Sequence, residues 1–369
     1  MLMRRNLLLG AASCGAVAPL LVACSSGTSH DEAARALRVP MAAATGDREV
    51  PTSGLMRELV RFATLAPSSH NTQCWKFRLQ ERAITIEPDM SRRTPVVDPD
   101  DHHLFVSLGC ATENLVQAAL ANGLRADARF DPAGAGGVAV ALEATKALPS
   151  PLFQAITERQ CTRGDYDGKP LSTDELRLLE QAGTGRGVRV MLITERPAME
   201  KVLEYVVSGN TAQMNDPAFV DELMAWIRFS AAEAAETGDG LYSGASGNPS
   251  LPRWLGSRVM GLFFTPKSEN ERYAKQIRNS AGIAVFASSV SDKAHWVEAG
   301  RCYERFALQA TALGIRNAFL NQPVEVGTIR PQFASALGLG NQRPDLVVRF
   351  GRGPSMPMSM RRPVRAVLA

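Results

Sequence analysis

The order in which apolar segments recur along the chain constrains its fold more than any other feature. Leu55 to Leu65 has apolar residues at helical spacing, and two segments that alternate like strands follow it, Trp75 to Leu79 and Ala83 to Glu87. A strongly apolar helix rich in Ala and Leu is expected from Leu108 to Ala121, where Asn122-Gly123 would end it. Val138 to Leu142 is the next expected strand.

A similar order begins again after Pro149-Ser150-Pro151. A helix N-cap at Ser172 to Glu175 is expected to open a helix at Leu176 to Ala182, followed by a strand at Val188 to Ile193. Later segments predict helices at Pro197 to Val207, Pro217 to Ala235 and Tyr303 to Leu313, and strands at Ile283 to Ala287 and Leu346 to Phe350. The two rounds predict an α+β fold made of two tandem halves, residues 51–150 and 151–369.

The second half contains a segment of unlike composition. Residues 236–270 are rich in Gly, Ser and Pro and carry the bulky aromatics Tyr242 and Trp254. An irregular insertion of this length inside a compact domain is typical of a lid or a binding loop.

The first residues of the chain read as an export signal. Arg4-Arg5 precedes an apolar stretch from Leu7 to Ala23, and Leu21-Val22-Ala23-Cys24 has the form of a lipobox. We therefore expect residues 1–23 to be removed, Cys24 to be lipidated, and 24–50 to be a tether on the periplasmic side of a membrane. The alternative is a membrane-spanning anchor, for which this stretch, with Pro19 inside it, is short against the roughly 30 Å of a hydrocarbon core. The arginine pair resembles a twin-arginine signal, which exports proteins that have already folded around a cofactor.

Charge and cysteine content exclude several classes of function. The formal net charge of +4 falls to about +2 without Arg4 and Arg5, and no basic run is long enough to predict nucleic-acid binding. The cysteines are scattered without a CxxC pair, and His102-His103 are far in sequence from the other histidines. We therefore expect no metal site and no disulfide framework.

Three short polar segments are candidates for ligand binding. Ser68, Ser69, Asn71 and Gln73 lie between a helix end and a strand, where they supply donors and acceptors for a planar polar ligand, although a capped turn has the same composition. Arg159, Thr162 and Arg163 precede the second round, and such a pair of arginines either holds a phosphate or lies on a solvated turn. The third segment, with Arg361 and Arg362, is unremarkable alone.

Taken together, the three segments resemble the FMN-dependent nitroreductase family over roughly residues 55–369. The loop resembles the family's Ser-Ser-x-Asn-x-Gln-Pro-Trp signature, with Cys74 in place of the proline, and 159–163 resembles its Arg-Arg-Ser-x-Arg phosphate motif, with departures at Gln160 and Cys161. In that family the loop and the arginines come from different subunits of a homodimer. Each motif occurs once here, and the tandem form resembles the family's Acg-like branch.

The resemblance implies a pseudo-dimeric monomer with one FMN. Ser68, Ser69, Asn71 and Gln73 would meet the ring and ribityl chain, and Arg159, Thr162, Arg163 and Arg361 or Arg362 the phosphate. Asn321 and Gln322 would either approach the flavin's reactive nitrogen or cap a strand end. The flavin carries the redox chemistry, so no catalytic side chain is expected.

Two functions remain open at this point. The first is an oxidoreductase that passes two electrons or a hydride to a small electrophile, such as a nitroaromatic or a quinone, from NAD(P)H or a membrane redox partner. The second is a protein that shields or stores FMN under a lid without turnover.

Overall fold

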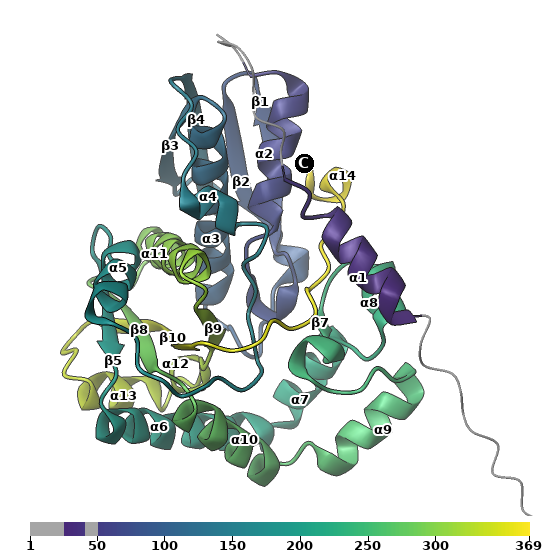
Figure 1. Cartoon of the computed structure of the whole chain (residues 1–369), viewed down its shortest axis with the longest axis vertical. Coiled ribbons are helices and arrows are strands. Elements are labelled where there is room, and N and C mark those ends of the chain that lie inside the picture. The colour runs from purple at the N-terminus through teal and green to yellow at the C-terminus, as the bar shows by residue number, and fades with distance from the viewer. Residues whose placement is uncertain (1–25, 41–50) are drawn as a thin grey trace, which may run out of the picture.

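The computed structural model describes residues 26–40 and 51–369 of the chain and confirms the predicted α+β class. The predicted signal peptide and Cys24 lie outside the described residues. Figure 1 shows one sheet beside helices α2 (Ser53–Thr64) and α3 (His102–Ala121) and a second sheet beside α11 (Lys293–Ala312). A further group of helices, residues 196–278, surrounds the second sheet and is called the helical arm below.

The first sheet has the strand order β1-β2-β4-β3, with all neighbours antiparallel. Its strands are β1 (Trp75–Gln80), β2 (Ala83–Pro88), β3 (Leu124–Asp131) and β4 (Gly137–Ala144). Helix α2 (Ser53–Thr64) packs on α3 (His102–Ala121), which covers this sheet with Leu108, Leu115 and their buried neighbours. Helix α3 is long and apolar enough to cross a membrane, but 78% of its apolar window is buried inside the protein, as in a core helix.

The second sheet repeats the same connectivity, in the order β5-β8-β10-β9 and again antiparallel. It contains β5 (Val188–Ile193), β8 (Gly282–Ser288), β9 (Arg316–Phe319) and β10 (Arg343–Gly351). Helix α5 (Thr173–Gly183), opened by the expected capping box at Ser172, and α11 (Lys293–Ala312) correspond in chain order to α2 and α3. The short α4 (Pro151–Ala155) joins the two rounds.

The two long helices pack against each other through a reciprocal pair of glycines. A Cβ added to Gly109 of α3 would lie 2.0 Å from the Val297 carbonyl oxygen, and one added to Gly300 of α11 would lie 1.9 Å from the Val106 carbonyl oxygen. Each glycine therefore packs against the backbone of the residue that lies three positions before the other glycine in the chain. A contact that exchanges equivalent residues in this way is characteristic of a two-fold axis.

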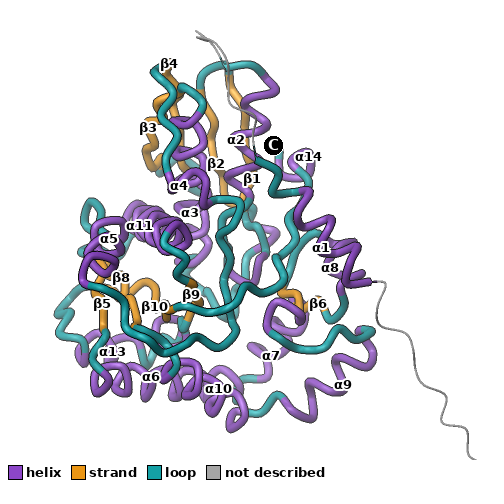
Figure 2. The backbone as a smooth tube through the Cα atoms, viewed as in Figure 1, coloured by secondary structure: helices purple, strands orange, loops and turns teal. Residues whose placement is uncertain are grey.

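The helical arm separates β5 from β8 and is much longer than the predicted insertion at 236–270. It comprises α6 (Arg196–Met214), α7 (Pro217–Trp226), α8 (Ala231–Thr237), α9 (Arg253–Phe263) and α10 (Pro266–Arg278), with β6 (Ile227–Arg228) and β7 (Leu241–Tyr242) paired between them. Figure 2 shows these helices and the loops that join them. The helix expected at Pro217 to Ala235 is broken at β6, and α8 begins anew at the Ser230 cap.

The second sheet is covered on both faces. Ala284 and Phe286 of β8 belong to the core shared with α11, whereas Ile283 and Val285 pack in a second core with residues of α6 and α10. The second core also contains Val324 of α12 (Gln322–Glu325) and Phe333 of α13 (Arg330–Ala336). This double burial explains why β8 is apolar throughout instead of alternating.

Part of the expected tether is folded. Residues Ser26–Ala36 form α1, and Ala34 packs with Ala231, Ala234 and Tyr242 near α8. At the other end of the chain, α14 (Val364–Val367) brings Leu368 beside Phe77 of β1, where the Ala369 amide donates to the Phe77 carbonyl oxygen at 2.9 Å. The start of the described chain therefore packs on α8 of the second half, and its end packs on β1 of the first half.

Candidate functional site

Two adjoining cavities lie between the halves and the helical arm. The larger has a volume of about 410 Å³ and is lined by the loop after α2, by β9 and β10, by residues of α6, α7, α9 and α10, and by the segments on either side of α8. The smaller, of about 50 Å³, shares Pro67, Ser68, Arg163, Leu241 and Phe319 with the larger. A cavity of the larger size is typical of small-molecule and cofactor sites.

The loop between α2 and β1 has an unusual backbone. His70, Asn71 and Gln73 all have positive φ, at 47°, 53° and 54°. Non-glycine residues in the left-handed region cost free energy unless surrounding contacts hold them, and such residues gather at functional sites. Here the backbone amide of Gln73 donates a hydrogen bond to the Ser68 hydroxyl at 2.9 Å, which closes the loop. Ser68 and Ser69 line the larger cavity.

The two amide side chains of this loop are already engaged by protein groups. Asn71 Nδ2 donates to the carbonyl oxygens of Gly240 and Met360, and its Oδ1 accepts from Arg361 at 2.9 Å. Gln73, which is fully buried, donates to the Gly238 carbonyl and accepts the Arg362 amide at 2.8 Å. Asn71 borders the smaller cavity only, and Gln73 borders neither, so the structure gives both amides the role of joining loop, arm and tail.

Four arginines surround the smaller cavity. Arg159, Arg163 and Arg361 come from two of the predicted motifs, and Arg38, from the segment expected to be a tether, joins them. Arg361 is held by the carbonyl oxygens of Thr64, Leu65 and Ala66 at the end of α2, and Arg38 by those of Ala34 and Ser359. Arg159 donates to the Leu65 carbonyl at 2.7 Å and pairs with Glu304 of α11 at 3.0 Å.

This cluster carries more positive than negative charge. Glu304 is the one carboxylate that the described chain places in an ion pair with these four arginines. Burial, and then the charge of Arg159, lowers the pKa of Arg38 to about 10, and burial with Arg38 and Arg159 lowers that of Arg361. Burial also raises the pKa of Glu304 to about 7, against the influence of Arg159. Buried cations without matching anions are costly, so the smaller cavity favours an anionic group.

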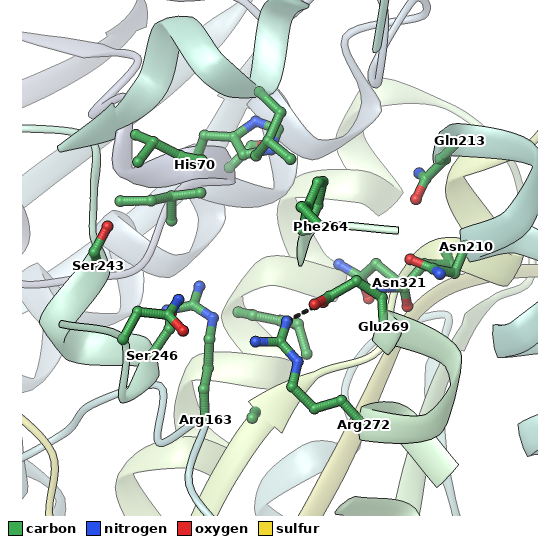
Figure 3. A pocket seen from close by; sticks show the side chains of 18 of the residues that line it. His70, Arg163, Asn210, Gln213, Ser243, Ser246, Phe264, Glu269, Arg272 and Asn321 are labelled. Carbon is green, nitrogen blue, oxygen red and sulfur yellow. Dashed lines mark hydrogen bonds and ion pairs between the residues drawn. The ribbon is translucent and has the colours of Figure 1, made fainter. Parts of the chain in front are cut away.

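The larger cavity presents polar groups that lack partners among the described residues. Arg163 points into it with no side-chain hydrogen bond or ion pair there, as Figure 3 shows. Gln322 Oε1 and Arg349 Nη1 are buried and have no hydrogen-bond partner among the described residues. The other terminal nitrogen of Arg349, Nη2, donates to the Gly164 carbonyl, and the guanidinium carbon lies 4.1 Å from the centroid of the Tyr166 ring. A ligand that offers both donors and acceptors would satisfy this set.

His70 is neutral in this environment. Burial, and then the charge of Arg163, lowers its pKa to about 4, and its Nδ1 has no partner among the described residues. On the opposite wall Arg272 pairs with Glu269, and Asn210 and Gln213 of α6 point inward (Figure 3). Because burial raises the pKa of Glu269 in spite of Arg272, this wall contributes little net negative charge toward a ligand.

The apolar part of the lining comes largely from the helical arm. Phe219, Leu223, Ile227, Phe229, Leu251, Val259, Met260, Phe263 and Phe264 form it. The predicted insertion therefore does line the cavity, together with α6 and α7, which the sequence did not assign to the site. An apolar wall opposite a few convergent polar groups suits a flat, partly hydrophobic ligand.

The structure gathers eight of the eleven predicted binding residues at the two cavities. They are Ser68, Ser69, Asn71, Arg159, Arg163, Asn321, Gln322 and Arg361. Gln73, Thr162 and Arg362 border neither cavity; Thr162 is fully buried and donates to Gln160, and Arg362 donates to the Ala366 carbonyl. Asn321 uses its Oδ1 to accept the Val347 amide, as expected of a cap, and still faces the larger cavity.

Sequence reasoning missed Arg38, His70, Arg349 and Arg272. Arg38 is four residues beyond Ala34, whose packing on α8 brings it to the site, and a short amphipathic segment in a polar region gives little warning of this. Arg349 lies in the expected strand at Leu346 to Phe350, which is otherwise apolar, and an arginine at that point was the one available signal.

Two proteins of Mycobacterium tuberculosis, from strains H37Rv and CDC 1551, are similar to the chain and carry provisional names as NAD(P)H nitroreductases. Each is 25% identical over 317 residues, which cover 82% of this chain and 87% of the relative. No protein-family model matches the chain.

Solved structures of nitroreductases are also similar to parts of the chain. One with bound FMN from Desulfitobacterium hafniense is 16% identical, covers 58% of this chain and 96% of its own, and has a TM-score of 0.38. The FMN-dependent nitroreductase NfnB from Mycobacterium smegmatis, solved with NADPH, is 12% identical over 55% of this chain and 87% of its own, with a TM-score of 0.35.

Proposed function

We propose that this chain is a nitroreductase-like oxidoreductase that binds one FMN between its two halves. The observation that carries the proposal is the cluster of four arginines, three of them buried, around a small cavity that opens beside a larger one. A phosphate monoester carries a charge of about −1.5 to −2 near neutral pH, which would balance the positive excess left by Glu304. The ring system would then lie in the larger cavity.

The residues present fit that cofactor. Arg38, Arg159, Arg163 and Arg361 would hold the phosphate, and Ser68, Ser69, His70, Gln322 and Arg349 would offer hydrogen bonds in the larger cavity. FMN, when bound, supplies two-electron chemistry, so the protein's tasks are to bind, orient and shield it. The apolar residues of the arm would exclude water from one side of the ring.

The repeated topology supports a tandem origin of the fold. Both sheets have the same strand order, both follow a helix of similar length, and Gly109 and Gly300 meet reciprocally. We propose that the chain is a fused pseudo-dimer of nitroreductase-like halves, exported through its N-terminal signal and anchored at Cys24. The relatives' names make NAD(P)H the first donor to test, and a nitroaromatic or quinone the first acceptor.

A second function has an observation in its favour. The arm residues between β6 and α10 line the larger cavity along much of its length, where donor and acceptor would have to alternate. A flavin held beneath them and inaccessible to NAD(P)H would make the protein a carrier or store of FMN. Anaerobic spectra of the full-length protein separate the two functions, because NADPH bleaches an accessible flavin whereas only dithionite bleaches a shielded one.

Arg163→Ala tests the FMN site most cleanly. Its guanidinium makes no side-chain bond within the described chain, so its removal leaves no stranded partner, whereas loss of Arg159 would leave Glu304 unpaired. Loss of a charged hydrogen bond, at about 1.5–3 kcal/mol, predicts roughly 10- to 150-fold weaker FMN binding by fluorescence titration. Arg129→Ala, at an exposed position on β3, is the control. Unchanged affinity in Arg163→Ala would refute the phosphate assignment.

A further inference from the structure

Helix α9 presents an exposed apolar surface that the fold itself does not explain. Leu262, Phe263 and Trp254 are 74%, 70% and 63% exposed, the highest values among the large hydrophobic side chains of the described residues. The other exposed large hydrophobics are scattered singly over the molecule. Three such side chains on one short helix are characteristic of an interaction surface.

The segment that carries these side chains contains basic residues and no acidic ones. Trp254, Arg258 and Leu262 follow each other at four-residue spacing and so share one face of α9, and the Arg258 guanidinium lies 5.9 Å from the Trp254 ring centroid. Arg253 and Lys267 flank them, and no Asp or Glu occurs between Gly240 and Ser268. Trp, Phe and Leu beside Arg and Lys are the residue set of helices that lie in the interface of an anionic bilayer.

The arrangement of α1 and α8 places this face near the start of the described chain. The apolar stretch Leu7 to Ala23 ends three residues before α1 begins, and α1 packs against α8. Glu233 of α8 pairs with Arg253 at the N-terminus of α9. Figure 1 shows α9 at the rim of the molecule, on the same side as α1.

We propose that the outer face of α9 rests in the headgroup region of an anionic lipid bilayer. Trp254 and Leu262 insert beside the acyl chains, and Arg258 and Lys267 contact the lipid phosphates. The opposite face of the same helix, with Val259 and Met260, lines the larger cavity, and Phe263 reaches both. Docking therefore puts one wall of that cavity at the membrane surface, where an apolar ligand dissolved in the bilayer is concentrated. The lipid contact does not depend on whether FMN binds.

Quenching of Trp254 by brominated lipid tests this proposal on the full-length chain. The protein is reconstituted into vesicles of phosphatidylglycerol and phosphatidylcholine whose acyl chains are brominated near the headgroup, and its emission is compared with that of Trp254→Phe. The other tryptophans, Trp75, Trp226 and Trp296, are common to both proteins, so the difference between the two isolates Trp254. We expect most of the Trp254 emission to be lost in brominated vesicles. Full Trp254 emission in brominated vesicles would overturn the proposal. The same holds if sedimentation then shows that a second copy of the chain covers α9.

A pair of variants distinguishes insertion of α9 from simple proximity to an anchored protein. Leu262→Ser, at a position that does not line the larger cavity, should restore most of the Trp254 emission, whereas Leu148→Ser, at a similarly exposed position between β4 and α4, should not. If all variants are quenched alike, α9 is near the membrane without resting in it, and the proposal fails. FMN content, measured on the same samples, reports separately on the proposed cofactor site.

Discussion

Asp345 is a buried carboxyl group whose ionisation should make stability depend on pH. Its Oδ1 lies 2.9 Å from His102 Nε2, its Oδ2 has no partner among the described residues, and Arg343 is 4.0 Å away. Burial raises the pKa of Asp345 from 3.8 to about 7, and burial lowers that of His102 well below its ordinary value. The folded protein therefore favours the neutral form of both partners in weakly acidic solution.

The sign of the effect follows from linkage. A group whose pKa is higher in the folded protein contributes stability below its unfolded pKa, and that contribution is lost as the pH rises through the folded value. Asn does not titrate. As the pH rises from about 4 to about 7, we therefore expect the free energy of unfolding of Asp345→Asn to increase relative to that of the parent, and we expect the difference between the two proteins to be constant outside that window. Urea unfolding of both proteins across this range measures the difference, and a difference independent of pH would contradict it. Glu304 and Asp98 titrate in the same window, but they are common to both proteins.

Asn71 provides a second test, of how the loop is held. Asn71→Ala removes two hydrogen bonds to carbonyl oxygens and one from Arg361, at about 1 kcal/mol each, with a further cost for leaving Arg361 less well paired. The expected loss is about 2–4 kcal/mol of unfolding free energy in urea. Asn71→Gly, which relieves the positive φ but makes none of these bonds, should lose less. Equal losses would show that the positive φ at this position costs little, and a loss well below 2 kcal/mol in Asn71→Ala would show that the side-chain bonds do not hold the loop.

At the residue level, the local motifs identified side chains that the fold brings together, but not the protein groups that these side chains contact. Arg159, Arg163 and Arg361 were identified from local motifs, and they meet although they are about 200 residues apart in sequence. The motifs did not predict that Asn71 and Gln73 would bond to protein groups, because a short motif does not show that the arm and the tail will supply carbonyl and amide groups. Arg38 was missed because its place depends on the docking of α1, a tertiary contact.

At the level of elements, the packing of α3 against α11 should be the contact most sensitive to an added side chain. Any side chain at Gly109 or Gly300 would collide with a backbone carbonyl group on the facing helix, which cannot move aside as a side chain can. We predict that Gly300→Ala costs about 3 kcal/mol or more, or prevents folding, as measured by thermal unfolding and soluble yield. Gly261→Ala, also in a helix but with open space around it, should be neutral or stabilising. Tolerance of Gly300→Ala would mean that the helices pack less closely.

Elements with a strong apolar pattern were predicted well, including the edge strand β5, and elements with a weak pattern were not. The two Ala-rich helices and the strands at Val188–Ile193 and within Gly282–Ser288 were expected from periodicity or apolar runs. Strand β3 was missed because its partly buried face is built from Ala126 and Ala128, which give a weak alternating signal on an edge strand. Helix α3 begins at His102, six residues before the expected start, because its first turn buries polar side chains.

For the whole molecule, the first question is how the chain is attached to the membrane. Residues 1–25 lie outside the described structure, so the lipobox at Leu21 to Cys24 stays a prediction. We expect Cys24→Ser to release the protein from membranes into the soluble fraction in a high-salt wash, which weakens the charged contacts of α9. The parent protein should stay bound under the same wash. Full retention of Cys24→Ser would favour an uncleaved membrane-spanning segment over a lipid anchor.

The whole molecule also determines how many cofactors one chain can hold. Glu113 of α3 and Glu304 of α11 occupy equivalent positions, each four residues beyond the glycine of the helix contact. Glu304 faces the cluster of arginines that has an excess of positive charge, whereas Glu113 pairs with Arg301 and Arg305, and Glu298 pairs with the same two arginines. The charges on the Glu113 side therefore balance without a phosphate.

This asymmetry predicts one FMN per chain. The loop after α5 gives further support, because a Cβ added to Gly185 would lie 2.4 Å from Glu298 Oε1 and 2.5 Å from Cys302 Sγ, so side chains already fill the space beside it. Saturating the full-length protein with FMN, removing the unbound fraction and comparing flavin absorbance with protein concentration gives the ratio. A ratio near one supports a single site between two unequal halves. A ratio near two would mean that the Glu113 side binds a second phosphate despite its balanced charges, and charge balance would then not explain where the cofactor binds.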